Sequence, residues 1–427
     1  MYKQTDIDDT QHLSEVNELF RQGFLLHQKG EFAKAAEIYK EVLARQPRHF
    51  DSLHLLGAIE IQNKNFLLGI DLISEAISLY PRHASAFNNR GFAYYALNKI
   101  SESIADYDSA IKLDPVYADA IYNKGIAHLT IGEFSVGWRL YESRWQRPNF
   151  ISPKRNFPQP LWLGDAKLEN KKILLHAEQG FGDTIQFCRY AKLVSDLGAK
   201  VYLEVPSLLL RLLKQLEGDF ELVSQGSSLP DFDLHCPLMS LPLAFKTNLD
   251  NVPLSTKYLS SETELQNKFL NGLGPKIRKR VGIAWSGRPT HGNDYKRSIA
   301  LSQIVKALPD GFDYISLQNE VREVDANSLQ NFPIQHFGNE LQNFADTAAL
   351  IDLMDVVISV DTSVAHLAGA LGKKTFLLLP FAPDWRWMLS RQDSPWYESL
   401  VLLRQDADCN WGPVLAQLSA ELTRPVS

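Results

Sequence analysis

Three short segments in the second half of the chain combine small, acidic and basic residues in patterns suited to chemistry on an anion. The first is Glu178-Gln179-Gly180-Phe181-Gly182-Asp183-Thr184. Gly180 and Gly182 permit a tight turn from a strand into a helix, and the Asp183 carboxylate could accept a proton from a hydroxyl. The alternative is that Asp183 only caps the helix by accepting hydrogen bonds from its free N–H groups.

The second segment is Ala284-Trp285-Ser286-Gly287-Arg288, and Asn293-Asp294-Tyr295-Lys296-Arg297-Ser298 follows it closely. Ser286 and Gly287 could offer unhindered hydrogen-bond donors to a diphosphate, and Lys296 or Arg297 could neutralise its charge. The alternative is an ordinary solvated loop.

The third segment runs from Ser359 to Leu371 and includes Asp361, Thr362, Ser363 and His366. A buried strand ends here and a helix begins directly with Thr362 and Ser363. The free N–H groups and the positive end of the helix dipole then form an anion site. Asp361 and His366 are polar where the pattern would tolerate apolar residues, although a histidine at this position is as often a satisfied core group.

Apolar runs that alternate with helical segments must position these three places. We predict two sets of strands, and near-continuous apolar strands indicate parallel sheets covered by helices on both faces. The break near residues 272–280 predicts two Rossmann-like halves facing a cleft, 171–275 and 276–427, which the resemblance described below implies to be the acceptor side and the nucleotide-sugar side. The predicted strands lie within residues 171–179, 199–206, 220–225 and 232–238, then 280–285, 312–318, 355–360, 374–380 and 400–405.

The first half contains an internal repeat. Glycines recur every 34 residues, prolines follow the same period, and a large apolar residue occupies a third slot. This lattice resembles the tetratricopeptide repeat, matches from about residue 14 to 147, and predicts an all-α solenoid of about four units over 1–147. Residues 148–170 are rich in proline and aromatic residues and predict an ordered linker. The lattice positions are Gly23, Gly57, Gly91 and Gly125; Pro47, Pro81 and Pro115; and Tyr39, Ile73, Tyr107 and Tyr141.

Asn89 and Asn123 occupy the same slot of successive repeats. Because equivalent slots of stacked repeats line one groove, these amides could bind the backbone of an extended peptide. The alternative is that they form hydrogen bonds between neighbouring repeats. The ladder is partial, since Arg21 and Leu55 fill the slot in the first two repeats.

Residues 171–427 resemble glycosyltransferase family 9, the bacterial heptosyltransferases. Three features carry the resemblance: the Gly-Asp turn, the segment 359–371, and the strand and loop LLLPFAPDWRW. The resemblance implies a GT-B fold of two Rossmann-like domains. Together with the repeats, the arrangement also resembles the protein O-GlcNAc transferase type. A tetratricopeptide solenoid followed by a GT-B domain is therefore the expected fold.

The resemblance also implies roles for residues. Asp183 would be the general base, beside Gly180 and Gly182 on the acceptor side. Asp361, Thr362, Ser363 and His366 would bind the donor diphosphate and sugar, although Ser363 stands where the family pattern has glycine. The implied reaction inverts the anomeric centre and needs neither metal nor cofactor beyond the nucleotide-diphosphate sugar. The departing diphosphate would be stabilised by the helix at Thr362 together with Lys296 or Arg297, and the repeats would supply Asn89 and Asn123 to a protein or peptide acceptor.

Composition limits the remaining classes. The net charge of −6 over 427 residues gives no basic excess for nucleic-acid binding. Three cysteines, no apolar leader and no apolar stretch of bilayer length predict a cytoplasmic protein without a membrane span. Two alternatives to an active transferase are a non-catalytic tetratricopeptide scaffold with a degenerate nucleotide-sugar-binding domain, and a nucleotide-dependent oxidoreductase. The dinucleotide fingerprint is only half present, because Ile185 stands at its third glycine position, although Glu204 could mimic its ribose-binding acid.

Asp231-Phe232-Asp233 matches the DxD string of metal-dependent transferases. It opens a predicted strand, and we interpret it as a turn and strand edge rather than a metal site.

Overall fold

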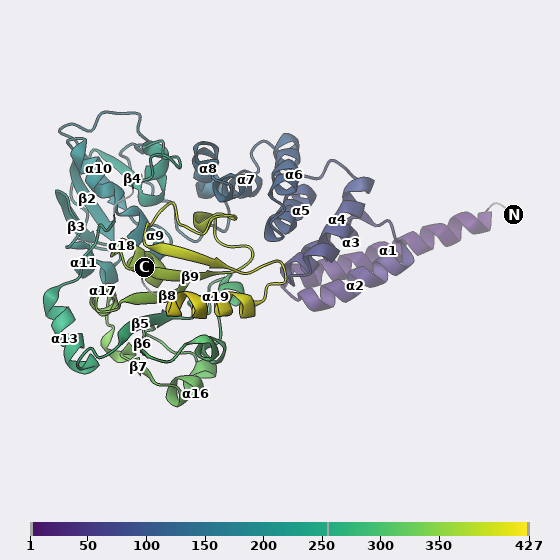
Figure 1. The fold of residues 1–427 in the computed structure, drawn as a ribbon. Coiled ribbons are helices and arrows are strands. Elements are labelled where there is room, and N and C mark those ends of the chain that lie inside the picture. The colour runs from purple at the N-terminus through teal and green to yellow at the C-terminus, as the bar shows by residue number, and fades with distance from the viewer. Residues whose placement is uncertain (1–2, 254–255, 425–427) are drawn as a thin grey trace. The chain divides into compact units, whose positions relative to one another are not determined.

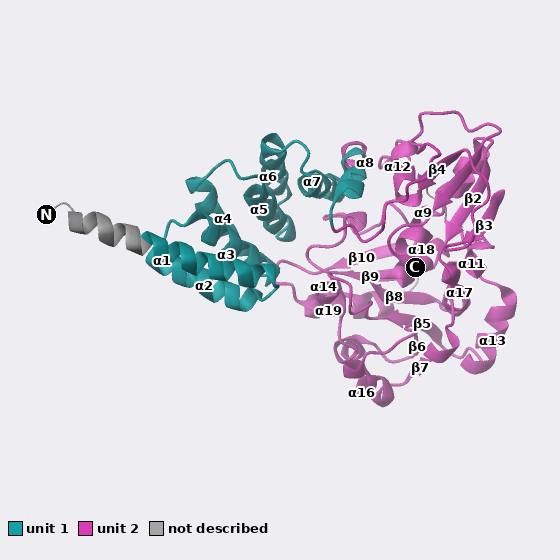
Figure 2. Cartoon of the chain, turned by 180° about the vertical axis from the view of Figure 1, so that it is seen from behind, with its two compact units in different colours: residues 1–131, 139–148 teal, residues 132–138, 149–427 magenta. Residues whose placement is uncertain are grey.

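The computed structural model describes residues 3–253 and 256–424, with side chains from residue 13 onward. The chain forms two compact units, coloured separately in Figure 2: residues 1–131 with 139–148, and residues 132–138 with 149–427. The division passes through one helix, α8 (Phe134–Tyr141), whose first five residues belong to the second unit. No helix among the described residues is both long and apolar enough to cross a bilayer.

The first unit is built from helices that pack in successive pairs (Figure 1). Its lattice glycines lie where the two helices of a pair approach most closely. A Cβ at Gly57 would lie 2.6 Å from Ile73, and one at Gly91 would lie 2.8 Å from the Tyr107 ring. At these two positions only glycine, which has no Cβ, admits the large lattice residue of the next helix. The helices are α1 (Lys3–Gln28), α2 (Phe32–Arg45), α3 (Phe50–Gln62), α4 (Phe66–Leu79), α5 (Ala84–Ala96), α6 (Ile100–Leu113), α7 (Ala118–Thr130), the end of α8, and the 3₁₀ turn η1 (Glu142–Gln146).

The described part of the second unit contains two parallel sheets of four and six strands. The first sheet has the order β3-β2-β1-β4 and the second the order β10-β9-β8-β5-β6-β7. The strands are β1 (Lys172–His176), β2 (Lys200–Val205), β3 (Phe220–Ser224), β4 (Leu234–Pro237), β5 (Lys279–Ala284), β6 (Phe312–Ser316), β7 (Ile334–His336), β8 (Val356–Val360), β9 (Thr375–Leu379) and β10 (Leu400–Arg404).

Both sheets follow the doubly wound strand order. Counted from its own first strand, the first sheet has the order 3-2-1-4 and the second the order 6-5-4-1-2-3. In such sheets ligands bind beyond the carboxyl ends of the strands, where the order reverses. The reversal points lie between β1 and β4 in the first sheet and between β5 and β8 in the second. The α/β class predicted from the alternating apolar runs is therefore present.

Helices and irregular segments complete the second unit. Helix α13 precedes the domain boundary expected at residue 275, but it packs against α17, which leads into β8 of the second sheet. Residues 149–170 contain no helix or regular strand, and Leu161 forms a parallel bridge with His235 of β4. The α helices are α9 (Phe181–Phe187), α10 (Tyr190–Asp196), α11 (Ser207–Leu213), α12 (Leu241–Ala244), α13 (Thr263–Leu273), α14 (Asp294–Arg297), α15 (Leu301–Ile304), α16 (Glu323–Asn331), α17 (Phe344–Asp352), α18 (Ser363–Ala370) and α19 (Trp411–Thr423).

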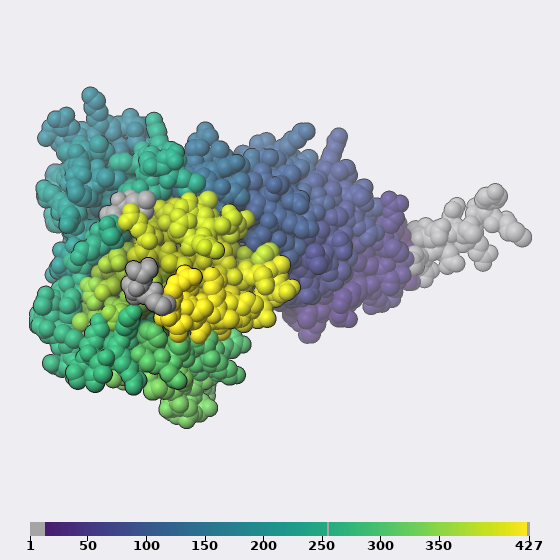
Figure 3. All heavy atoms as spheres, viewed as in Figure 1, coloured from purple at the N-terminus to yellow at the C-terminus, as the bar shows by residue number. Residues whose placement is uncertain are grey.

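Helix α19 illustrates how the second sheet is covered. Val414, Leu415 and Leu418 join the core formed with β5 and β8, because they recur at helical spacing along one face of α19. The opposite face of α19 is mostly exposed, and this C-terminal region appears yellow in Figure 3. The short 3₁₀ turns of the unit are η2 (Leu238–Ser240), η3 (Val305–Ala307), η4 (Gly338–Glu340) and η5 (Trp385–Trp387).

Candidate functional site

Four segments that follow carboxyl ends of parallel strands meet in the second unit. They are the turn at the start of α9, the loop 285–298 after β5, the start of α18 after β8, and residues 380–397 between β9 and β10. We call the last segment the tryptophan loop, since it contains Trp385, Trp387 and Trp396. The structure thereby brings together all three segments that the sequence singled out, at the reversal points of both sheets.

Asp183 is bonded through both carboxylate oxygens. Oδ2 accepts a hydrogen bond of 2.7 Å from the Gly180 N–H, as a helix cap would, and Oδ1 accepts from the guanidinium of Arg386. Burial raises the pKa of Asp183, and the cation of Arg386 opposes that shift. The side chain is nevertheless 19% exposed, so its carboxylate remains open to solvent. Asp183 therefore both caps α9 and presents a carboxylate at the site.

Arg386 is the residue that sequence reasoning missed. Its Nη1 donates to Asp384 Oδ1 at 2.8 Å and its Nε to Gln186 Oε1 at 2.7 Å, and the guanidinium lies 4.3 Å from the Trp385 ring centre. It occurs in the LLLPFAPDWRW run, which carried a resemblance but no residue role. An arginine between two tryptophans in the segment that follows a buried strand was the available signal, because buried arginines are paired.

Two further carboxyl groups at the site have opposite pKa shifts. Burial raises the pKa of Asp361 to about 6, and the neighbouring Asp384 carboxylate adds to the shift. Burial would also raise the pKa of Asp384, but the charge and hydrogen bonds of Arg386 outweigh it and lower that pKa. Titratable neighbours whose pKa values are pushed apart in this way are typical of catalytic sites.

His366 belongs to α18, and its ring packs against α9. Its Nδ1 lies 2.9 Å from the Tyr397 hydroxyl, and its ring stacks on Trp387 at 5.2 Å. A Cβ at Gly182 would lie 2.8 Å from His366 Cδ2, so only glycine allows the two helices this approach. Burial lowers the pKa of His366 to about 3 and keeps the ring neutral. The histidine therefore has the contacts of the core group that the sequence left as the alternative.

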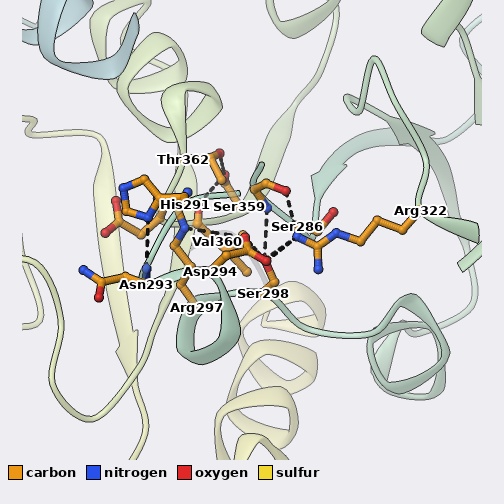
Figure 4. Close-up of polar contacts among 12 residues, drawn as sticks. Ser286, His291, Asn293, Asp294, Arg297, Ser298, Arg322, Ser359, Val360 and Thr362 are labelled. Carbon is orange, nitrogen blue, oxygen red and sulfur yellow. Dashed lines mark hydrogen bonds and ion pairs between the residues drawn. The ribbon is translucent and has the colours of Figure 1, made fainter. Parts of the chain in front are cut away.

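The loop after β5 is held by an internal network, shown in Figure 4. The Gly287 N–H donates to Ser298 Oγ at 3.0 Å, and Ser286 Oγ accepts from Gln318 at 3.0 Å. Arg322 donates to Asp294 at 2.5 Å and to the Gly287 carbonyl at 2.7 Å. The Gly287 N–H is therefore already engaged within the loop, whereas Ser286 Oγ acts as an acceptor toward Gln318 outside it.

Arg297 is the cation best placed beside α18. Its Nη1 donates to the Asp361 carbonyl at 2.7 Å, and its buried Nε has no hydrogen-bond partner among the described residues. A Cβ at Gly287 would lie 2.6 Å from this guanidinium, so the glycine makes room for it. Thr362 is the N-cap of α18 and makes no side-chain cap hydrogen bond. The adjacent Lys296 donates to the Ala382 carbonyl of the tryptophan loop at 2.8 Å.

The second unit also contains a cleft of about 900 Å³ beyond the end of β3. Arg211 and Glu262 form an ion pair of 2.6 Å across it. The Phe344 ring, next to the lining residue Asn343, lies 5.0 Å from the Phe181 ring, two residues before Asp183. The cleft is lined by Ser207, Leu208, Leu210, Arg211, Lys214, Gln215, Leu222, Ser224, Glu262, Gln342 and Asn343.

The first unit has a separate hollow of about 240 Å³. Asn89 Nδ2 lies 3.1 Å from His54 Nε2, and Asn123 donates to Asn88 Oδ1 at 3.0 Å. The two asparagines thus bridge neighbouring repeats, as the alternative interpretation held, and they also line the hollow. Its lining residues are Ala58, Ile61, Asn88, Asn89, Phe92, Asp119, Asn123 and Arg147.

Two acidic residues noted in the sequence are engaged in structural contacts. Glu204 is buried and paired with Arg155 of the segment before β1. Asp233 accepts from the Lys172 N–H at 2.8 Å, which ties the two strand starts together. Within the residues that the structure describes, no group of three or more His, Cys, Asp or Glu side chains could hold a metal ion.

Sequence comparison identifies the repeats. Residues 20–84 match the family described as Tetratricopeptide repeat, and residues 93–132 match the one described as TPR repeat. The first unit is an array of tetratricopeptide repeats. Protein FlbA of Caulobacter vibrioides is 23% identical over 315 residues, which cover 67% of this chain and 52% of that protein. The chain therefore spans about half the length of this curated relative.

Solved tetratricopeptide structures resemble only a part of the chain. MamA (41-end) from Desulfovibrio magneticus RS-1 is 21% identical and covers 30% of this chain and 71% of its own, with a TM-score of 0.27. The first TPR of Spaghetti (RPAP3), bound to HSP90 peptide SRMEEVD, is 21% identical and covers 26% and 88%, with a TM-score of 0.25.

Proposed function

We propose that the chain is a glycosyltransferase that moves a sugar from a nucleotide-diphosphate donor to a hydroxyl acceptor. In this proposal the two doubly wound sheets are the two halves of a GT-B fold. The observation that carries it is the meeting of a carboxylate, Asp183, with an anion site formed by the start of α18 and Arg297. Both lie at reversal points of the sheets, where ligands of such folds bind.

The donor diphosphate binds at the start of α18. The N–H groups after Thr362 and the positive end of the helix dipole face the phosphates. Arg297, whose Nε makes no hydrogen bond to the described residues and lies 3.9 Å from Asp294 Oδ1, supplies a cation. Lys296 adds positive charge nearby. These groups stabilise the negative charge that develops on the leaving diphosphate, the part that a metal ion plays in other transferases.

Asp183 acts as the general base. It accepts the proton of the acceptor hydroxyl while that oxygen forms a bond to the anomeric carbon, and the bond from this carbon to the diphosphate oxygen breaks. The leaving diphosphate keeps the electron pair, and attack from the opposite face inverts the anomeric centre. Each carboxylate oxygen has two lone pairs, so Asp183 can accept this proton beside its bonds to Gly180 and Arg386.

The acceptor is a protein segment, in this proposal, because the chain carries a tetratricopeptide array. The 240 Å³ hollow of the first unit offers amides at Asn89 and Asn123 and the exposed ring of Phe92, which suit an extended peptide. The 900 Å³ cleft of the second unit has room for the residue that receives the sugar.

One observation favours a second candidate, a non-catalytic repeat scaffold. The Asp183 carboxylate is bonded to both Gly180 and Arg386, and the Gly287 N–H is satisfied within its own loop. A degenerate site could retain such contacts for stability alone.

A ligand screen followed by a turnover assay separates the two. Nucleotide sugars are added to the full chain, and the melting temperature is measured; a ligand at 100 times its Kd adds about 2.7 kcal/mol. Donor hydrolysis or transfer that is lost in Asp183→Asn supports the transferase. Donor binding without turnover in the unaltered chain supports the scaffold, and stabilisation by no nucleotide sugar contradicts both.

A further inference from the structure

Helix α8 departs from the repeat pattern at its start. The repeat match ends at residue 132, and residues 132–138 belong to the second unit. Gly132, in the left-handed region, lies so close to that unit that a Cβ would be 2.7 Å from Met388 and 2.9 Å from Leu249. The start of α8 is therefore built into the α/β unit.

Aromatic side chains fix this segment to the tryptophan loop. Trp138 is 1% exposed, and its ring lies 5.1 Å from Trp385 and 6.3 Å from Phe187, edge-on to both. One turn earlier, Phe134 stacks on Trp396 at 5.8 Å. Edge-on pairs of this kind contribute beyond the burial of area alone and are sensitive to geometry.

Trp385 and Phe187 are also the rings against which Arg386 rests. The guanidinium carbon lies 4.3 Å from the Trp385 ring centre and 5.8 Å from that of Phe187. Phe187 is the last residue of α9, the helix that carries Asp183 in its first turn. Trp138 therefore contacts the supports of both partners in the Asp183–Arg386 ion pair.

We propose that Trp138 is a positioning residue for the Asp183–Arg386 pair, so that the start of α8, which belongs to the second unit, is part of the transferase machinery. The inference rests on the proposed glycosyltransferase function. Removal of the indole would leave space beside Trp385 and Phe187, and the guanidinium would no longer be held against two fixed rings. A displacement of about 1 Å at a reacting group can lower turnover roughly 100-fold.

The test uses three variants of the full chain. Trp138→Leu removes the ring, Trp138→Phe restores an aromatic edge, and Trp162→Leu is the matched control. Trp162 is buried in the same unit, but it packs on Phe245 and donates to the Ala166 carbonyl. We expect Trp138→Leu to lower kcat about 10-fold or more with a donor KM within about threefold of the unaltered chain. Trp138→Phe should recover most of this loss, and Trp162→Leu should retain kcat. An equal loss of kcat in both leucine variants would overturn the proposal.

A second measurement does not depend on activity. The free energy of unfolding is compared for Trp138→Leu, Arg386→Gln and the double variant, and the cycle is repeated with Trp162→Leu. Coupled residues give non-additive changes, and distant residues give additive ones. Non-additivity for Trp138 but not for Trp162 supports the positioning role, and additivity in both cycles overturns it. If Trp138 and Arg386 give non-additive changes in a chain that transfers no sugar, the proposed function fails while the structural coupling stands.

Discussion

The guanidinium of Arg386 donates to the carboxylate of Asp183 across 203 residues of sequence. The contact joins the turn after β1 of the first sheet to the loop after β9 of the second. Arg386 is itself held by Asp384 and Gln186, so the carboxylate is oriented by a fixed partner. The predictions below test what this pair and its surroundings do.

Asp183→Asn should abolish most sugar transfer and leave donor binding intact. An asparagine oxygen can still accept from the Gly180 N–H, so the helix cap is retained while the base is lost. Loss of general-base catalysis lowers kcat by about 10² to 10⁴-fold. Turnover and calorimetric donor affinity are measured beside Asp231→Asn, which alters an exposed carboxylate. Turnover within a few-fold of the unaltered chain would leave Asp183 as a cap only.

Arg386→Gln should move the acid limb of the kcat/KM profile to higher pH. The cation lowers the pKa of Asp183, so its removal raises that pKa, and the base becomes protonated at a higher pH. The control is Arg391→Gln, which breaks an exposed ion pair with Asp393 in the same loop. An acid limb that stays in place or moves to lower pH contradicts the assignment.

Arg297→Ala should weaken nucleoside diphosphate binding by roughly 1.5–3 kcal/mol, the usual worth of a hydrogen bond to a charged group. Lys296→Ala tests the neighbouring cation in the same way, and Lys306→Ala, an exposed position of η3, should have no effect. Binding is followed by calorimetry with and without a chelator, and the chelator should leave the affinity for nucleoside diphosphate unchanged. Strict dependence on magnesium or manganese would exclude this mechanism.

His366→Gln should flatten the dependence of stability on pH. The pKa of His366 in the fold is about 3, whereas the pKa of a histidine in the unfolded chain is about 6.5. Between these values the unfolded state binds the extra proton, so stability present above about pH 6.5 is lost as the pH falls toward 3. Denaturant unfolding at several pH values within this window checks the slope. Equal slopes in variant and unaltered chain would mean that the histidine is not held neutral.

Asn89→Ala with Asn123→Ala should reduce transfer to a protein acceptor while donor hydrolysis persists. Each substitution also removes a bond between repeats, at about 1 kcal/mol apiece. Ser52→Ala is a useful comparison, because this buried hydroxyl has no hydrogen-bond partner among the described residues and does not line the hollow. If the double variant glycosylates the same protein at the same rate, the hollow is not the acceptor site.

Periodicity made much of the architecture predictable. The 34-residue lattice predicted the repeats because each close approach of two paired helices requires a glycine, as at Gly57 and Gly91. Each of the nine apolar runs overlaps a strand, and β5 begins one residue before its run. Strand β7 was missed because it is three residues long and mostly exposed. Arg386 could not be assigned a role from the sequence, because its partner Asp183 is set by tertiary packing. The same holds for Ser298 and Arg322, whose bonds to Gly287 are visible only once the loop is folded.

The sharing of α8 between the two units has a consequence for the order of events during synthesis. The helices before it can pair as soon as they leave the ribosome, because their partners are close in sequence. Trp138 must wait until Trp385 and Trp396 have been made. Until these tryptophans are made, the aromatic side chains of residues 132–138 lack their partners in the tryptophan loop. Such a segment is a natural target for chaperones, because transiently exposed apolar surface is prone to aggregation.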